Sequence, residues 1–147
     1  MVPDEFEVPP LLETDEYLLR PLTVDDVIRD YDAVMSSVDR LVGVFGEGTW
    51  PVGLTLAEDL VDLGWHQREF TLRHSFAYTV VTLDGTTCLG CVYLYPSEAA
   101  PLGQAADVYL WVRSSAEPSG LDGRLESRVR EWLRDDWPFP EVHFPGR

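Results

Sequence analysis

Two side chains that can take part in proton transfer, Asp107 and Tyr109, stand two positions apart in the segment 107–113. Apolar residues alternate with polar or aromatic ones there, which is the period of a β-strand, so both side chains should lie on one face. A carboxylate in that position is a candidate general base, with the phenol as its polar neighbour. We predict Asp107 and Tyr109 as catalytic residues; the alternative for Asp107 is a solvated residue at the start of a strand.

A loop rich in Ser, Gly and Pro, residues 114–123, follows this strand and leads into an amphipathic segment. Backbone N–H groups at the start of a helix bind anions such as pyrophosphate. This loop, however, carries the carboxylates Glu117 and Asp122. Ser119 and Asp122 have the spacing of a capping box, so the sequence predicts that the protein's own carboxylate occupies the positive helix end.

The pair Cys88-x-x-Cys91 could be a redox pair or half of a zinc site. The residues after it continue as a strand, on which positions i and i+3 point to opposite faces, so the two sulfur atoms are predicted to lie apart. Few other ligands are present, since there is no second cysteine pair and the histidines are His66, His74 and His143. We therefore predict buried, inert cysteines and no metal site.

The chain is strongly acidic, with 26 Asp and Glu against 11 basic residues and a formal net charge of −15. Such a surface repels phosphate backbones and anionic lipids, so we expect neither nucleic acid nor membrane partners. A small-molecule or peptide amine would suit this field. The alternative is that the acidic excess serves solubility alone.

All basic residues are arginines, so no lysine can act as a nucleophile or form a Schiff base. The two cysteines and the absence of a basic, apolar leader at the N-terminus predict a cytoplasmic protein. No apolar run approaches the roughly 18 residues of a membrane span.

The periodicity predicts one domain over residues 16–147, preceded by an acidic, flexible arm over residues 1–15. Thr23 with Asp26, and Thr55 with Glu58, have capping-box spacing and begin two helices. The expected strands are 17–22, 76–83, 86–95, 107–113 and 139–144, with a two-residue turn at Asp84-Gly85 and helices beginning at 23, 55 and 121.

The order of these elements resembles that of the GNAT (GCN5-related N-acetyltransferase) superfamily. The opening Leu18-Leu19-Arg20-Pro21-Leu22-Thr23 is similar to its first strand and helix, and Cys88-Leu89-Gly90-Cys91-Val92 to its third strand. The resemblance covers residue 16 to the end. It implies an α+β fold with a mixed, mostly antiparallel sheet, helices on both faces, and truncation after the fifth strand.

The resemblance also implies binding of acetyl-CoA at the point where the fourth and fifth strands splay apart. Carried over to this sequence, the cofactor-binding positions are Trp111, Val112, Arg113, Ser119, Gly120 and Leu121.

The loop departs from the family pattern, which has Gln or Arg where Glu117 stands and Gly or Ala where Asp122 stands, while Gly120 matches the first glycine. Two like charges about 5 Å apart at an effective dielectric near 20 repel by on the order of 3 kcal/mol. Arg113 or Arg124 could offset part of this repulsion.

We favour an acetyl-CoA-dependent N-acetyltransferase, in which the amine attacks the thioester directly and Asp107 or water accepts its proton. The alternative is a catalytically silent GNAT-like module that binds a protein partner or itself. The loop carboxylates support this alternative, as does the absence of a tyrosine after Tyr109, because the family often uses a later tyrosine as general acid. An exposed sheet edge would favour a homodimer.

Overall fold

The computed structural model describes all residues, 1–147, and is built on one six-stranded sheet. The strands are β1 (Leu12–Glu13), β2 (Tyr17–Pro21), β3 (Phe76–Thr82), β4 (Cys88–Pro96), β5 (Ala105–Val112) and β6 (Glu141–His143). They lie side by side in chain order, and every neighbouring pair is antiparallel except β5 and β6, which are parallel. The predicted mixed, mostly antiparallel α+β fold is confirmed.

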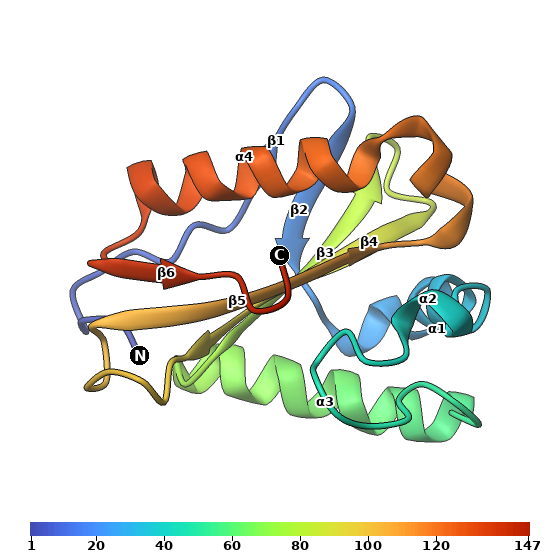
Figure 1. Ribbon diagram of the computed structural model, residues 1–147, viewed down its shortest axis with the longest axis horizontal. Helices are drawn as coiled ribbons and strands as arrows, with labels where there is room; N and C mark the ends of the chain where they lie inside the picture. The colour runs from blue at the N-terminus through green and yellow to red at the C-terminus, as the bar shows by residue number, and fades with distance from the viewer.

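Helices cover both faces of the sheet (Figure 1). Helix α4 (Leu121–Asp136) lies across one face, and α1 (Val27–Met35) and α3 (Leu56–Leu72) lie across the other, with α2 (Val38–Leu41) beside α1. Each face has its own core of buried apolar side chains. No helix combines the length and the apolar composition needed to cross a membrane.

The alternation along β5 places its side chains as predicted. Val108, Leu110 and Val112 belong to the core beneath α4, whereas Trp111 and the partly buried Tyr109 belong to the core beneath α1 and α3. Tyr109 therefore faces α1 and α3.

Two of the three predicted capping boxes are present. Thr23 and Asp26 form one before η1 (Val24–Asp26), a 3-10 turn leading into α1, and Thr55 and Glu58 form the other at α3. The predicted two-residue hairpin turn is wrong. Thr82 and Thr87 are joined by a backbone hydrogen bond of 3.1 Å, so the loop between β3 and β4 comprises residues 83–86.

Residues 1–15 are held against the domain, and the predicted flexible arm is wrong. Met1 and Leu12 are buried in the core beneath α4. The N-terminal ammonium of Met1 donates to the carbonyl of Arg73 at 2.6 Å, and the Tyr78 hydroxyl donates to the carbonyl of Pro9 at 2.8 Å. Acidic composition suggested a loose segment, but its few apolar side chains reach the core.

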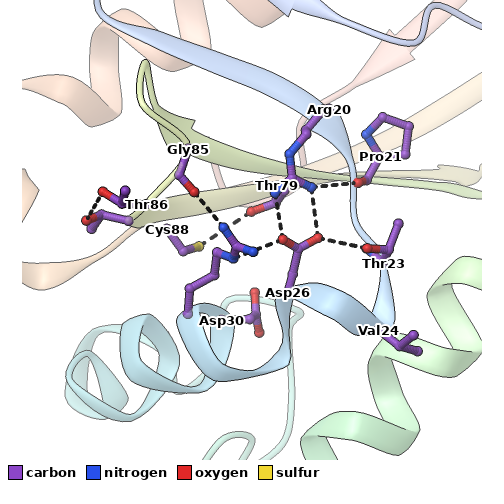
Figure 2. A network of polar contacts seen from close by, with 12 residues as sticks. Arg20, Pro21, Thr23, Val24, Asp26, Asp30, Thr79, Gly85, Thr86 and Cys88 are labelled. Carbon is purple, nitrogen blue, oxygen red and sulfur yellow. Dashed lines mark hydrogen bonds and ion pairs between the residues drawn. The ribbon is translucent and has the colours of Figure 1, made fainter.

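A buried carboxylate fixes α1 to the sheet (Figure 2). Arg20 on β2 donates to both oxygens of Asp26 at 2.9 and 2.7 Å, and Arg29 lies 3.2 Å from the same group. Burial opposes ionisation of Asp26, but the hydrogen bonds from Arg20 and Thr23 outweigh it and hold the pKa of Asp26 below its usual value. Asp30, one helical turn later, is positioned by this anchor.

Candidate active site

The sheet opens between β5 and β6. These strands pair in register only at Ala105, Ala106 and Asp107, whereas β4 pairs with β5 from Pro96 to Gly90. Beyond Asp107 the outer edge of β5 therefore has no strand beside it, and the predicted splay lies here. A cavity of about 400 Å³ occupies the opening and is lined by Tyr109, Leu110 and the segment 145–147, with residues 43, 44 and 46 opposite.

Two arginine side chains cover the free edge of β5. Arg147 donates to the carbonyl of Leu110 at 2.9 Å, and Arg40 donates to the carbonyl of Val112 at 3.2 Å. These carbonyls point away from β4, because the alternate positions Trp111 and Arg113 face it. The edge thus offers the backbone groups that an extended ligand could pair with.

Helix α4 begins beside this edge without a side-chain cap. Gly120, in the left-handed conformation with φ of 75°, is its N-cap residue. The hydroxyl of Ser119 donates to the carbonyl of Ala116 at 2.6 Å, so the predicted capping box between Ser119 and Asp122 is wrong. The N-terminal turn of α4, which includes Leu121, keeps the positive end of its dipole uncapped.

Asp122 is paired with the same two arginines that cover the strand edge. It lies 3.1 Å from Arg40 and 2.8 Å from Arg147, and Glu117 lies 3.2 Å from Arg40. The hydrogen bond from Arg147 is the main reason that the pKa of Asp122 lies below its ordinary value. The loop carboxylates that depart from the family pattern are therefore paired with arginines of the protein itself.

The arginines expected to offset these carboxylates pair with other carboxylates. Arg113 donates to the carbonyl of Cys88 at 3.2 Å and pairs with Asp32 at 3.0 Å, on the side of α1. Arg124 pairs with Glu16. The sequence could not identify Arg40 and Arg147, because both reach the loop from segments distant along the chain.

Asp107 is joined to a histidine that the sequence did not single out. The parallel pairing sets Asp107 opposite His143, and the Asp107 carboxylate lies 3.1 Å from Nδ1 of that imidazole. Both groups line a second cavity of about 720 Å³, together with Tyr109 and Tyr95. A carboxylate that orients an imidazole is a suitable arrangement for proton transfer.

Trp111 does not line either cavity. Its side chain is 2% exposed, and its indole N–H donates to the hydroxyl of Tyr93 at 3.3 Å. Its backbone faces β4, where Trp111 pairs with Cys91, so the structure does not place Trp111 at the open edge. The side chain belongs to the core.

The expectation that Cys88 and Cys91 point to opposite faces is wrong. The pairing of β3 with β4 shifts register so that Leu89 is an extra residue, and this bulge turns both cysteines into the core beneath α1. Their sulfur atoms and a carboxylate oxygen of Asp30 lie within 4.8 Å of one another, and all three residues are buried. Three such ligands fall short of the four of a structural zinc site, so the absence of a metal stays a prediction.

Comparison by sequence yields no relative: no protein-family model matches the chain, and no curated protein is similar to it. Comparison of structures finds similar proteins. A ribosomal-protein-S5-alanine acetyltransferase from Vibrio fischeri superposes with a TM-score of 0.68 at 16% identity, over 86% of this chain and 67% of its own.

Two further solved structures carry bound nucleotides. The ribosomal L7/L12 α-N-protein acetyltransferase RimL, in complex with coenzyme A, matches with a TM-score of 0.68 at 16% identity, over 86% of this chain and 70% of its own. The microcin C7 self-immunity acetyltransferase MccE, in complex with acetyl-CoA and AMP, matches with a TM-score of 0.66 at 11% identity, over 88% and 71%. The fold of this protein is therefore the GNAT fold, as the order of its elements predicted.

Proposed function

We propose that the protein is an N-acetyltransferase that moves an acetyl group from acetyl-CoA to an amine by direct attack. The observation that carries this proposal is the edge of β5 from Val108 to Val112, which no strand pairs and only arginine side chains cover, beside the uncapped start of α4. In a GNAT fold this juxtaposition offers backbone groups to an extended arm and a positive helix end to a pyrophosphate.

The residues present fit such a ligand. Within the segment 111–113 the backbone of Val112 faces the open edge, as does that of Leu110. These groups would hold the pantetheine arm once Arg40 and Arg147 release the two carbonyls, and the amides of residues 119–121 would hold the pyrophosphate. Arg40 and Arg147 bind Asp122 in the structure, and both could exchange this carboxylate for phosphate oxygens, which arginine binds equally well. Acetyl-CoA would supply an activated acyl group as a thioester, and on transfer its C–S bond would break and coenzyme A would leave as a thiolate that takes a proton from water.

The protein's own side chains would prepare the amine. An ammonium has no free electron pair, so a group in the cavity must take its proton before attack. His143, with its Nδ1 held by Asp107, can accept that proton, and Tyr109 lines both the cavity of this pair and the cavity at the edge of β5. Asp107 then acts through the imidazole, and water is the other acceptor.

Binding of acetyl-CoA tests the proposal directly. At a concentration 100 times Kd, a ligand of the native state adds about 2.7 kcal/mol to the free energy of unfolding, which a thermal shift assay detects. Arg40→Gln should weaken this binding, whereas Arg134→Gln at the exposed far end of α4 should leave it unchanged. A melting temperature unmoved by millimolar acetyl-CoA would leave the silent, partner-binding module as the function.

A further inference from the structure

A third cavity, of about 250 Å³, lies between α1, α3 and the sheet on the face opposite α4. Carboxylates of Asp30 on α1 and of Asp59 and Asp62 on α3 line it. The rest of its wall is largely aromatic and comprises Phe45, Trp50, Trp65, His66, Tyr93 and Tyr95 together with Leu22 and Leu63.

The acidic groups of this cavity lack basic partners in the protein. Asp59 is 2% exposed, and its Oδ2 atom has no hydrogen-bond partner. Asp30 is 3% exposed and accepts one hydrogen bond, from the thiol of Cys91 at 3.3 Å. None of the ion pairs in the protein includes Asp30, Asp59 or Asp62. Buried carboxylates without partners are unfavourable unless something else compensates them.

The ionisation of these groups shows the same deficit of positive charge. Burial, and then repulsion from Asp59, raises the pKa of Asp30 to about 7. Burial, and then repulsion from Asp62, raises the pKa of Asp59 to about 6. Burial lowers the pKa of His66 to about 4, so the imidazole is neutral at pH 7 and supplies no compensating charge.

The geometry favours an organic cation over a metal ion. Only one group of three metal-ligating atoms lies within 4.8 Å of one another, and it consists of Asp30 and the two cysteines. Asp59 and Asp62 therefore do not converge with Asp30 on one point. Aromatic faces attract alkylammonium groups, and carboxylates spread over two helices can surround a chain that is longer than an ion.

We propose that this cavity binds the ammonium end of an alkyl diamine or of a lysine-like side chain, and so selects the acceptor of the transfer. The proposal rests on the proposed function for its second half. Phe45, Trp65 and Tyr95 line both this cavity and the one that holds Asp107 and His143, so the two spaces adjoin. A diamine with one ammonium among the aspartates can direct its other amine towards Asp107 and Tyr109.

Calorimetric titration without acetyl-CoA tests the cavity separately from the transfer. The probe is 1,4-diaminobutane, with butane-1,4-diol as the uncharged control of equal length. We expect the diamine to bind and the diol not to bind. Asp59→Asn keeps the size of the side chain and breaks no hydrogen bond, because Oδ2 of Asp59 has no partner. The substitution should weaken diamine binding by at least about tenfold.

Asp136→Asn is the matched control, because it removes the same charge from an exposed position on the opposite face. Equal affinities of the two variants would overturn the proposal, since binding would then reflect only the overall charge of −15. A short peptide with a central lysine, compared with the same peptide carrying norleucine, distinguishes a free diamine from a protein side chain. Binding of the diamine alone assigns the free molecule, and absence of both overturns the cavity as a cation site.

The proposed function fails separately. If the diamine binds with the expected dependence on Asp59 but no acetylated product forms, the transferase is refuted and the cation site stands. If an amine is acetylated at the same kcat/KM in Asp59→Asn and in the wild type, the cation site is refuted and the transferase stands.

Discussion

Replacing Asp122 by asparagine should tighten the binding of acetyl-CoA. Asp122 lies at the start of α4, where a pyrophosphate would bind, and it holds Arg40 and Arg147 at 3.1 and 2.8 Å. The substitution removes a negative charge from the site and one of the two carboxylate partners of each arginine, since Arg40 still pairs with Glu117 and Arg147 with Glu126. Asparagine keeps the size of the side chain and one hydrogen-bond acceptor.

The size of the effect follows from Coulomb's law. A carboxylate about 5 Å from a phosphate charge, at an effective dielectric near 20, opposes binding by about 3 kcal/mol, which corresponds to roughly a hundredfold in Kd. The two arginines already neutralise part of this charge, so we expect a gain between about tenfold and a hundredfold. Loss of the partly exposed ion pairs should lower the free energy of unfolding by no more than about 1 kcal/mol.

Isothermal titration calorimetry of acetyl-CoA measures this gain, with Asp136→Asn as the control. Asp136 is the last residue of the same helix, about 21 Å away at a rise of 1.5 Å per residue, well beyond the screening length of about 8 Å at physiological salt. The control should bind like the wild type. If Asp122→Asn binds no more tightly than the control, the carboxylate does not oppose the ligand and the electrostatic account of this loop is refuted.

Three further outcomes can be measured. His143→Gln should lower kcat by about a hundredfold or more at pH 7 and leave Kd for acetyl-CoA unchanged; an unchanged kcat would make water the proton acceptor. The pKa of Asp30 in the folded protein is raised to about 7, so its contribution to the free energy of unfolding is lost as the pH rises from about 4 to about 7. In urea unfolding, the free energy of unfolding of Asp30→Asn relative to the wild type should therefore be higher at pH 8 than at pH 5 by on the order of 2 kcal/mol. Gly90→Ala would place a Cβ 2.0 Å from the carbonyl oxygen of Trp111 and should lower the free energy of unfolding by about 1–3 kcal/mol or more. Gly123→Ala, in a helix with open space around it, should not lower the free energy of unfolding.

Most elements of the fold could be predicted because their signals are local. The alternation in residues 107–113 identifies a strand and separates its two faces, and the capping boxes at Thr23 and Thr55 identify the starts of two helices. The capping box at Ser119 failed for a nonlocal reason. Its carboxylate, Asp122, is held by Arg40, which lies 82 residues away in the sequence.

The candidate site depends on pairings that no local pattern encodes. His143 reaches Asp107 only because β6 runs parallel to β5 in one particular register. Likewise, a single extra residue at Leu89 brings Cys88 and Cys91 to one face and reverses the prediction from simple alternation. The only sequence signal for His143 was that it is a polar residue in the last predicted strand, and this signal did not indicate that Asp107 would be its partner.

The distribution of charge over the protein bears on how so acidic a chain could bind acetyl-CoA, as the proposed function requires. At the end where α4 begins, Arg40 and Arg147 offset the carboxylates that the loop carries. At the other end, Asp30 and Asp59 are buried without a cation. The two regions therefore differ in whether their carboxylates are paired with arginine, and the proposed function would use this difference for an anionic acyl donor and a cationic acceptor. Net charge averages over this difference between the two regions. The value of −15 alone therefore could not distinguish a binding site for an amine from an acidic excess that serves solubility.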